Sequence, residues 1–351
     1  MTLNSSDIKV AIVDDSALIR QIIQKVVDKT PGMRVVGMAQ DPFEAREMIK
    51  AQNPDVITLD VEMPKMNGIE FLDKIMKLRP MPVIMVSTLT EKGADITVQA
   101  LEIGAIDYVA KPEIKHMNDD FLSFFEAELI PKIQNIKSTN ISALSSLKNN
   151  TSHSANTSQK SAYDLIAIAS STGGIERLRY LFSHIEIELP SVVIVQHINE
   201  IYVQNMVERM QNICPPHLKV QKSRHNKKLE ANTIYFADNV SHMEIKPKGS
   251  DLYLFHHDEP PLNGFKASAD YLFQSISFVK NLNILGLILS GMGNDGAKGL
   301  KQLKNSGALT IGENKNSCLV YGMSKAAMDM GAIDKELTIQ SITKHLNSER
   351  L

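Results

Sequence analysis

Short apolar runs alternate with amphipathic stretches along most of the chain, and several of these runs stop at acidic or hydroxyl side chains. In the first third, each apolar run is typical of a buried parallel strand and is followed by apolar residues at helical spacing. The predicted strands are 8–13, 33–38, 56–59, 82–86 and 108–110, and the predicted helices include one capped by Ser16, one near 43–51 and one from about 119 to 137. This alternation predicts a doubly wound, five-stranded parallel sheet.

The same alternation returns in the second half of the chain. Apolar runs at 165–169, 192–195, 234–236 and 284–289 predict a second α/β domain with a mostly parallel sheet. Between the halves, Ser, Thr and Asn dominate and apolar periodicity is lost, which is typical of a flexible linker. We therefore expect one domain over 1–137, a linker over 138–162 and a second domain over 163–351.

Composition narrows the class of protein. The net charge of −2 gives no basic excess, and no DNA-reading helix is apparent, so nucleic acid is not an expected partner. Two cysteines, Cys214 and Cys318, do not make a disulfide framework or a cysteine-rich metal site. No signal peptide and no apolar run of membrane-spanning length are found, so we expect a cytoplasmic protein that is not embedded in a membrane.

Charged side chains follow the predicted strands of the first half. Asp14 and Asp15 follow the first strand, Asp60 the third, Ser87 the fourth and Lys111 the fifth. An acidic pair at one strand end is more often an ordinary helix cap, but the carboxyl ends of parallel strands share one edge of the sheet. Three carboxylates that meet there need a cation such as Mg²⁺. The set suits phosphoryl transfer onto Asp60, with the metal and Lys111 neutralising the phosphoryl oxygens.

Hydroxyl, imidazole and carboxyl side chains follow strands of the second half in the same way. Ser171 lies in an Ala-x-Ser-x-Gly turn after the 165–169 run, a pattern similar to a nucleophile elbow, although serine there is also an ordinary helix cap. His197 follows 192–195, and Asp295 lies in the glycine-rich turn 291–296 after 284–289. They supply nucleophile, base and orienting acid, in a chain order that differs from that of α/β-hydrolases. As a nucleotide fingerprint, the glycine pattern is weak.

The first half resembles the receiver domain of two-component response regulators over roughly 8–137. The matching pieces are Val13-Asp14-Asp15, Leu59-Asp60, Met63-Pro64-x-Met66-Asn67-Gly68, Val86-Ser87 and Lys111-Pro112. The resemblance implies Asp60 as the phosphoacceptor and Asp14, Asp15 and Asp60 as the Mg²⁺ site. It also implies that Ser87, Tyr108 and Lys111 serve the switch.

Residues from about 164 to 334 resemble the catalytic domain of chemotaxis protein-glutamate methylesterases. The matching pieces are Ala169-Ser170-Ser171-Thr172-Gly173-Gly174, Val195-Gln196-His197, the 290–297 stretch and Val320-Tyr321-Gly322-Met323. The resemblance implies a phosphorylation-activated serine hydrolase that removes glutamate methyl esters from the cytoplasmic domains of chemoreceptors and releases methanol. It also allows glutamine deamidation, and it implies a chemotaxis histidine kinase as phosphodonor. Backbone N–H groups at Thr172 and Met292 are the expected oxyanion donors, and ester hydrolysis needs no cofactor.

The chain departs from the methylesterase pattern at four places. The family usually has Gly at Ala169, Pro at Asn199 and Pro at Ser324, and its His-Arg-Pro-Ser-x-Asp segment stands here as 265–270. We expect these changes in the region that binds a substrate peptide, whereas the triad is unchanged. Two alternatives therefore stay open: a receiver-controlled esterase with another substrate, and a non-catalytic docking module.

Overall fold

The computed structural model describes residues 7–88, 91–112, 120–141, 143 and 160–348. It divides into two compact units, Met1–Ile141 and Ser142–Leu351, and each is described by itself. Most of the predicted linker lies outside the described residues. Within the described part of the chain, no helix is both long and apolar enough to cross a membrane.

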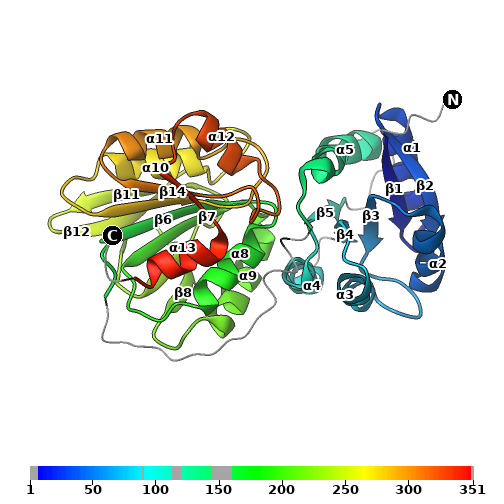
Figure 1. Ribbon diagram of the computed structural model, residues 1–351, viewed down its shortest axis with the longest axis horizontal. Helices are drawn as coiled ribbons and strands as arrows, with labels where there is room; N and C mark the ends of the chain where they lie inside the picture. The colour runs from blue at the N-terminus through cyan, green and yellow to red at the C-terminus, as the bar shows by residue number, and fades with distance from the viewer. Residues whose placement is uncertain (1–6, 89–90, 113–119, 142, 144–159, 349–351) are drawn as a thin grey trace. The chain divides into compact units, whose positions relative to one another are not determined.

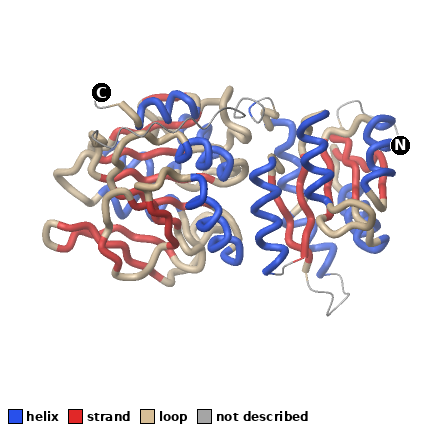
Figure 2. Tube along the Cα trace, turned by 90° about the horizontal axis from the view of Figure 1, so that it is seen from below, coloured by secondary structure: helices blue, strands red, loops and turns tan. Residues whose placement is uncertain are grey.

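The first unit is the doubly wound sheet that the sequence predicts. Its strands pair in the order β2-β1-β3-β4-β5, and every pairing is parallel. Helices cover both faces of the sheet (Figures 1 and 2). Its elements are β1 (Ile8–Val13), α1 (Ala17–Lys29), β2 (Met33–Ala39), α2 (Pro42–Gln52), β3 (Val56–Asp60), α3 (Gly68–Leu78), β4 (Val83–Thr88), α4 (Glu91–Ile103), β5 (Asp107–Lys111) and α5 (Asp120–Glu128).

Local chemistry sets where these helices begin. Ser16, Asp41 and Asn67 have extended backbones and cap α1, α2 and α3, because their side chains accept hydrogen bonds from the first free N–H groups. The strand order reverses between the neighbouring strands β1 and β3. Asp14 and Asp60 therefore lie at the switch point, where open α/β sheets bind ligands.

The single helix predicted over 119–137 is wrong, because the structure divides that stretch. Helix α5 ends at Glu128, and α6 (Ile130–Gln134) and a 3₁₀ turn (Asn135–Ser138) follow it. Pro131 explains the break, since proline has no N–H to donate to the carbonyl of the preceding turn. Apolar spacing continues through the break and hides it in the sequence.

The second unit is built on a seven-stranded sheet in which every pairing is parallel. The strand order is β15-β14-β13-β6-β7-β10-β8. The parallel strands are β6 (Leu165–Ser170), β7 (Ser191–Gln196), β8 (Lys219–Lys222), β10 (Thr233–Phe236), β13 (Ile284–Ile288), β14 (Leu309–Glu313) and β15 (Lys335–Leu337). A three-stranded antiparallel sheet, which the sequence analysis did not predict, consists of β9 (Lys227–Lys228), β11 (His242–Lys248) and β12 (Asp251–His257).

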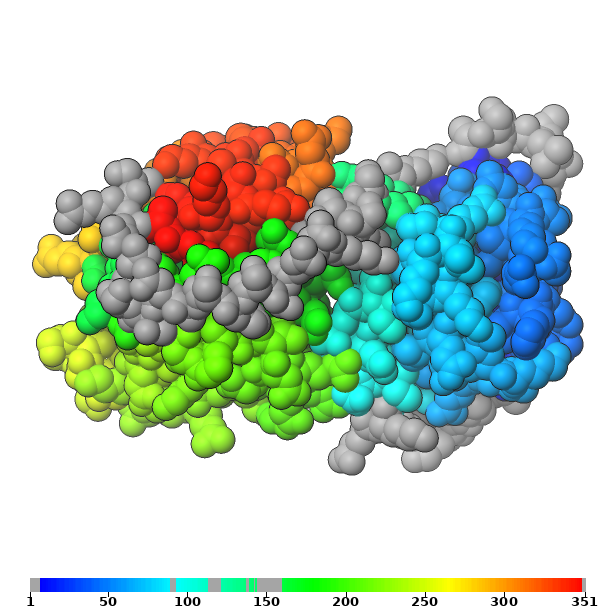
Figure 3. Space-filling view, turned by 60° about the horizontal axis from the view of Figure 1, so that its bottom comes forward, coloured from blue at the N-terminus to red at the C-terminus, as the bar shows by residue number. Residues whose placement is uncertain are grey.

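Helices form a layer on each face of the parallel sheet. In Figure 1, α8 (Gly174–Ser183), α9 (Glu200–Ile213) and α13 (Ile339–Leu346) lie on one face, and α10 (Ala269–Ser277), α11 (Ala297–Asn305) and α12 (Met323–Asp329) lie on the other. Figure 3 shows α13, in red, on the surface of the unit. Strands β6 and β13 are neighbours at the point where the strand order reverses, so the turns that follow them open at one place.

Candidate active site and acidic pocket

Ser171 lies in the tight turn between β6 and α8. Its N–H donates to the Ser290 carbonyl at 3.0 Å, and its carbonyl accepts from Gly174 N–H at 2.8 Å. Gly173 has φ +73°, and a Cβ there would meet Leu319 and the Ser290 hydroxyl. Only glycine fits this turn without strain. Ser171 is 9% exposed, so the turn holds the hydroxyl in a largely enclosed position.

His197 follows the strand next to that of Ser171. Ser170 and Gln196 are partners in the parallel pairing of β6 with β7, so Ser171 and His197 follow the two strands at the same level. A backbone hydrogen bond from His197 N to the Ser170 carbonyl, 2.9 Å long, joins the two strand ends. The strand pairing therefore places the predicted nucleophile and the predicted base at the same edge of the sheet.

Asp295 binds the imidazole of His197. Nε2 of His197 and Oδ2 of Asp295 are 2.9 Å apart, and Asp295 is fully buried. Because a carboxylate can only accept, Nε2 carries the proton and Nδ1 is the basic nitrogen of the neutral ring. Nδ1 is buried and has no hydrogen-bond partner, which leaves it available to take a proton.

The carboxylate of Asp295 accepts hydrogen bonds from several further groups. Ser268 Oγ donates to it at 2.7 Å, Ala269 N at 2.7 Å, Asp270 N at 3.2 Å and Asn263 Nδ2 at 2.9 Å. Burial raises the pKa of Asp295, but hydrogen bonds and charge from His197, with those from Ser268 and Asn263, outweigh it and lower the pKa to about 2. The carboxylate is thus held ionised and in one orientation.

These donors were not predicted, and they change the interpretation of the 265–270 segment. We expected its departures from the family pattern to lie in a substrate region. The structure places the segment against the predicted triad: Ser268 Oγ and the N–H groups of Ala269 and Asp270 donate to Asp295, and the Phe265 ring stacks on His197. Its part in substrate binding stays a prediction. The available signal was the serine that this segment shares with the family pattern. Asn263 gives no signal in the sequence, because its contact spans 32 positions.

Gln196 is a second residue that sequence reasoning missed. Its Nε2 donates to the Ser171 carbonyl at 3.0 Å and to the His197 carbonyl at 3.1 Å, and its Oε1 accepts from Ser170 Oγ at 2.6 Å. One buried amide therefore joins the backbone of the Ser171 turn to that of His197. Its position directly before His197 was the signal available.

The turn at Ser171 lies against the turn that follows β13. A Cβ added to Gly291 would approach the Ser171 Cβ to 3.0 Å. The close approach requires glycine at 291 and brings Thr172 and Met292 onto adjoining turns. Their role as oxyanion donors stays a prediction.

The predicted acidic pocket is present in the first unit. Carboxylate oxygens of Asp14, Asp15 and Asp60 lie within 4.8 Å of one another, and Lys111 Nζ lies 2.9 Å from Asp14 and 2.8 Å from Asp60. Burial and the neighbouring Asp14 raise the pKa of Asp60 to about 6, although Lys111 opposes the shift. Three carboxylates that meet in one pocket are the donor set that a hard divalent cation fits.

The predicted switch residues lie on the neighbouring strands. Ser87 is buried at the end of β4, with its hydroxyl 3.1 Å from that of Thr97 on α4. Tyr108 is half-buried on β5, and Lys132 Nζ lies 5.8 Å from the centre of its ring. Ser87 and Tyr108 are thus on the adjacent strands β4 and β5, with Tyr108 two positions before the partner of Ser87.

Comparisons with known proteins agree with this architecture. Residues 166–346 match the family model described as CheB methylesterase, and residues 10–119 match the response regulator receiver domain. The chain is 39% identical to a protein-glutamate methylesterase/protein-glutamine glutaminase of Nitrosomonas europaea, over 97% of this chain and 95% of that one. It is 38% identical to a protein of the same name from Salmonella typhimurium, over 97% and 96%.

A solved structure supports the fold of the second unit. The catalytic domain of a CheB methylesterase from Thermotoga maritima matches 53% of this chain and 98% of its own length, with a TM-score of 0.50 and 24% identity. That likeness concerns the fold alone. The full-length identity and the two family models go further, and they show that the chain belongs to the receiver-containing CheB methylesterase family.

Proposed function

We propose that Ser171, His197 and Asp295 carry out the methylesterase reaction. Ser171 Oγ adds to the carbonyl carbon of a glutamate methyl ester while His197 Nδ1 takes its proton. His197 then gives that proton to the departing methoxide, which leaves as methanol. Water next attacks the glutamyl-enzyme ester with His197 as base, which releases the glutamate carboxylate and restores Ser171. The observation that carries the proposal is the 2.9 Å contact of Asp295 with Nε2, which leaves Nδ1 as the base.

Two further groups stabilise the charges that form. Backbone N–H groups of Thr172 and Met292 are our proposed donors to the oxyanion of the tetrahedral intermediate. Asp295 stabilises the imidazolium of His197 without taking a proton, in keeping with its low pKa. A glutamine side chain could react by the same route with ammonia as the leaving group, so we propose deamidation as a second reaction of this site.

We propose methylated glutamates on the cytoplasmic domains of chemoreceptors as the substrate, and a chemotaxis histidine kinase as the phosphodonor. The support is the printed name of the relatives together with the receiver unit on the same chain. A cytoplasmic location stays a prediction.

In the receiver unit, we propose Asp60 as the phosphoacceptor. Asp14, Asp15 and Asp60 would hold Mg²⁺, which when bound supplies positive charge beside the phosphoryl oxygens. Lys111 already contacts Asp14 and Asp60, so it can pair with a phosphoryl oxygen once Asp60 is modified. Ser87 and Tyr108 are the proposed switch pair, and phosphorylation is expected to raise hydrolase activity.

The test is methanol release from methylated receptor membranes, with and without a small phosphodonor and Mg²⁺. Ser171→Ala should abolish release in both conditions. Ser183→Ala is the matched control, because that serine is also 9% exposed and ends α8, where its hydroxyl bonds the Tyr180 carbonyl. Normal release by Ser171→Ala would refute the assignment of the nucleophile. Hydrolysis of other esters without methanol release from receptors would refute the substrate alone.

A further inference from the structure

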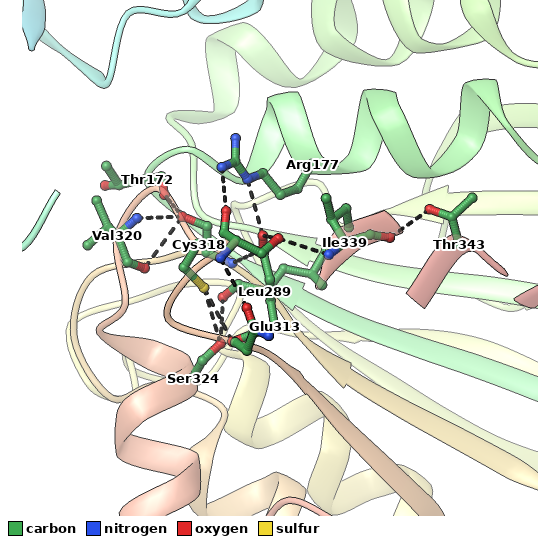
Figure 4. A network of polar contacts seen from close by, with 12 residues as sticks. Thr172, Arg177, Leu289, Glu313, Cys318, Val320, Ser324, Ile339 and Thr343 are labelled. Carbon is green, nitrogen blue, oxygen red and sulfur yellow. Dashed lines mark hydrogen bonds and ion pairs between the residues drawn. The ribbon is translucent and has the colours of Figure 1, made fainter. Parts of the chain in front are cut away.

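A buried ion pair lies behind the nucleophile turn. Arg177 on α8 and Glu313 at the end of β14 are both fully buried, with Nε and Oε1 3.3 Å apart (Figure 4). Burying two charges costs several kcal/mol of solvation for each ion, which the pairing seldom repays with a surplus. Arg177 Nη1 is also buried without a hydrogen-bond partner. Stability is therefore a poor explanation for this pair.

A residue that follows β14, Ser317, makes hydrogen bonds with Arg177 and with one carboxylate oxygen of Glu313. Ser317 Oγ donates to Glu313 Oε1 at 2.7 Å, and Arg177 Nη2 donates to the Ser317 carbonyl at 2.7 Å. Ile339 N–H donates to Ser317 Oγ at 2.8 Å. Glu313 Oε1 is thus fixed from two directions, and the carboxylate has little freedom to rotate.

The other carboxylate oxygen of Glu313 is connected to the Ser171 turn through one residue, Ser290. Glu313 Oε2 accepts from Ser290 N–H at 2.9 Å. The Ser290 carbonyl accepts from Ser171 N–H at 3.0 Å, and its hydroxyl donates to the Thr172 carbonyl at 2.9 Å. Figure 4 shows this chain of contacts running from Arg177 toward Thr172. Ser290 also begins the turn that carries Met292 and Asp295.

We propose that Glu313, held and neutralised by Arg177, is a positioning residue for the methylesterase reaction. By fixing Ser290, its carboxylate sets the spacing between the Ser171 turn and the turn that follows β13. Arg177 holds the carboxylate and cancels a negative charge that would oppose an oxyanion on the same turns. Neither residue touches substrate. The inference rests on the proposed role of Ser171.

The test replaces the charge pair in two ways and measures kcat and KM for ester hydrolysis by the full chain. Arg177→Met with Glu313→Gln removes both charges, yet the amide oxygen can still accept from Ser290 N–H. Arg177→Met with Glu313→Met removes the charges and that acceptor. We expect kcat near wild type in the first pair, and a loss of about 10- to 100-fold in the second with KM within about twofold, the scale expected for a misplaced reacting group.

A control separates positioning from general loss of stability. Thr310→Val alters the other end of β14, where the buried Thr310 hydroxyl bonds Asp334 at 2.9 Å. It should lower the unfolding temperature and leave kcat unchanged. The double variant Arg177→Met with Glu313→Met is called the Met pair. A Met pair that folds and has kcat within about twofold of wild type would overturn the proposal, since a misplaced turn should lower kcat far more.

A second comparison serves if the Met pair does not fold. Glu313→Gln alone leaves the buried guanidinium of Arg177 without an anion, and kcat should fall and then recover when Arg177→Met is added. Equal kcat in the single and double variants would also overturn the proposal. Covalent labelling of Ser171 by a fluorophosphonate, in which Oγ displaces fluoride, tests the role of Ser171 separately from positioning by Glu313. Lack of wild-type labelling would contradict the role of Ser171, whereas slower labelling in the Met pair alone supports positioning.

Discussion

The ring of Phe265 lies flat on the imidazole of His197, with the ring centres 3.7 Å apart and the planes 3° apart. The proposed base therefore has one face covered by an aromatic ring, one edge bound to Asp295 and a buried Nδ1. An aromatic face attracts a cation, so Phe265 should favour the imidazolium that forms when Ser171 loses its proton.

Replacing Phe265 should slow the chemical step. For Phe265→Leu we expect kcat to fall about 2- to 30-fold, the range that corresponds to one cation–π contact of about 0.5–2 kcal/mol. Phe265→Tyr keeps the ring and should stay close to wild type. Steady-state kinetics of both variants check this, and a Leu variant as fast as the Tyr variant would show that the stacking does not assist the base.

Asp295→Asn should cost about 10⁴-fold in kcat, as in other triads in which the acid is replaced by its amide. Donors from Ser268, Ala269 and Asn263 surround this position, so an amide N–H₂ there would face other donors. The double variant with Ser171→Ala should lose no more activity than Ser171→Ala alone, because triad members act as a unit. Additive losses in the double variant would indicate separate roles instead.

The low pKa of Asp295 has a consequence for stability in acid. Its pKa in the folded protein, about 2, is below the ordinary value of 3.8, so the unfolded chain binds the proton more tightly. The stability that the ionised carboxylate contributes is complete above about pH 4 and is lost as the pH falls toward 2. Acid unfolding of wild type and Asp295→Asn should therefore converge toward pH 2. A stability difference that does not change between pH 5 and pH 2 would contradict this assignment.

The raised pKa of Asp60 makes stability change with pH in the opposite direction. Its pKa of about 6 in the folded protein exceeds the ordinary value of 3.8, so the folded state binds the proton more tightly and loses stability as the pH rises from about 4 to 6. Asp60→Asn should stabilise the receiver unit by about 1–3 kcal/mol at pH 7.5 in the absence of Mg²⁺, and much less at pH 4.

Mg²⁺ provides the internal control for that experiment. Added at about 10 mM, it should raise the unfolding temperature of the wild-type chain and have a smaller effect on Asp60→Asn, because a ligand stabilises the state that binds it. Equal stabilisation of both chains by Mg²⁺ would argue against Asp60 as part of the metal site.

Those features of the fold that depend on local pattern could be predicted. The strand-ending residues Asp14, Asp60, Ser171 and His197 are on the ligand edges where the alternation of strands and helices places them. The helix break at Pro131 was missed because the apolar spacing continues beyond it. The antiparallel strands were missed because their sequence is rich in polar residues, as in His242–Lys248.

Most of the surroundings of the site could not be predicted, because they depend on contacts between distant segments. Asn263 reaches Asp295 across 32 positions, and Arg177 reaches Glu313 across 136. Polar and charged side chains such as these are usually on the surface, so no pattern in the sequence places them in the interior. Only the folded arrangement brings them beside the nucleophile turn.

The second unit holds another serine–histidine–aspartate arrangement, which allows a direct test of Ser171 as the nucleophile. His256 Nε2 is 2.9 Å from Ser223 Oγ, and His256 Nδ1 is 3.1 Å from Asp238 Oδ2. Mass spectrometry of the full chain after reaction with a fluorophosphonate will show which serine is activated. We expect the label on Ser171, and we expect His197→Ala to prevent it and His256→Ala to leave it unchanged. Label on Ser223, or label on Ser171 that survives His197→Ala, would contradict the assignment of Ser171 and His197 as nucleophile and base.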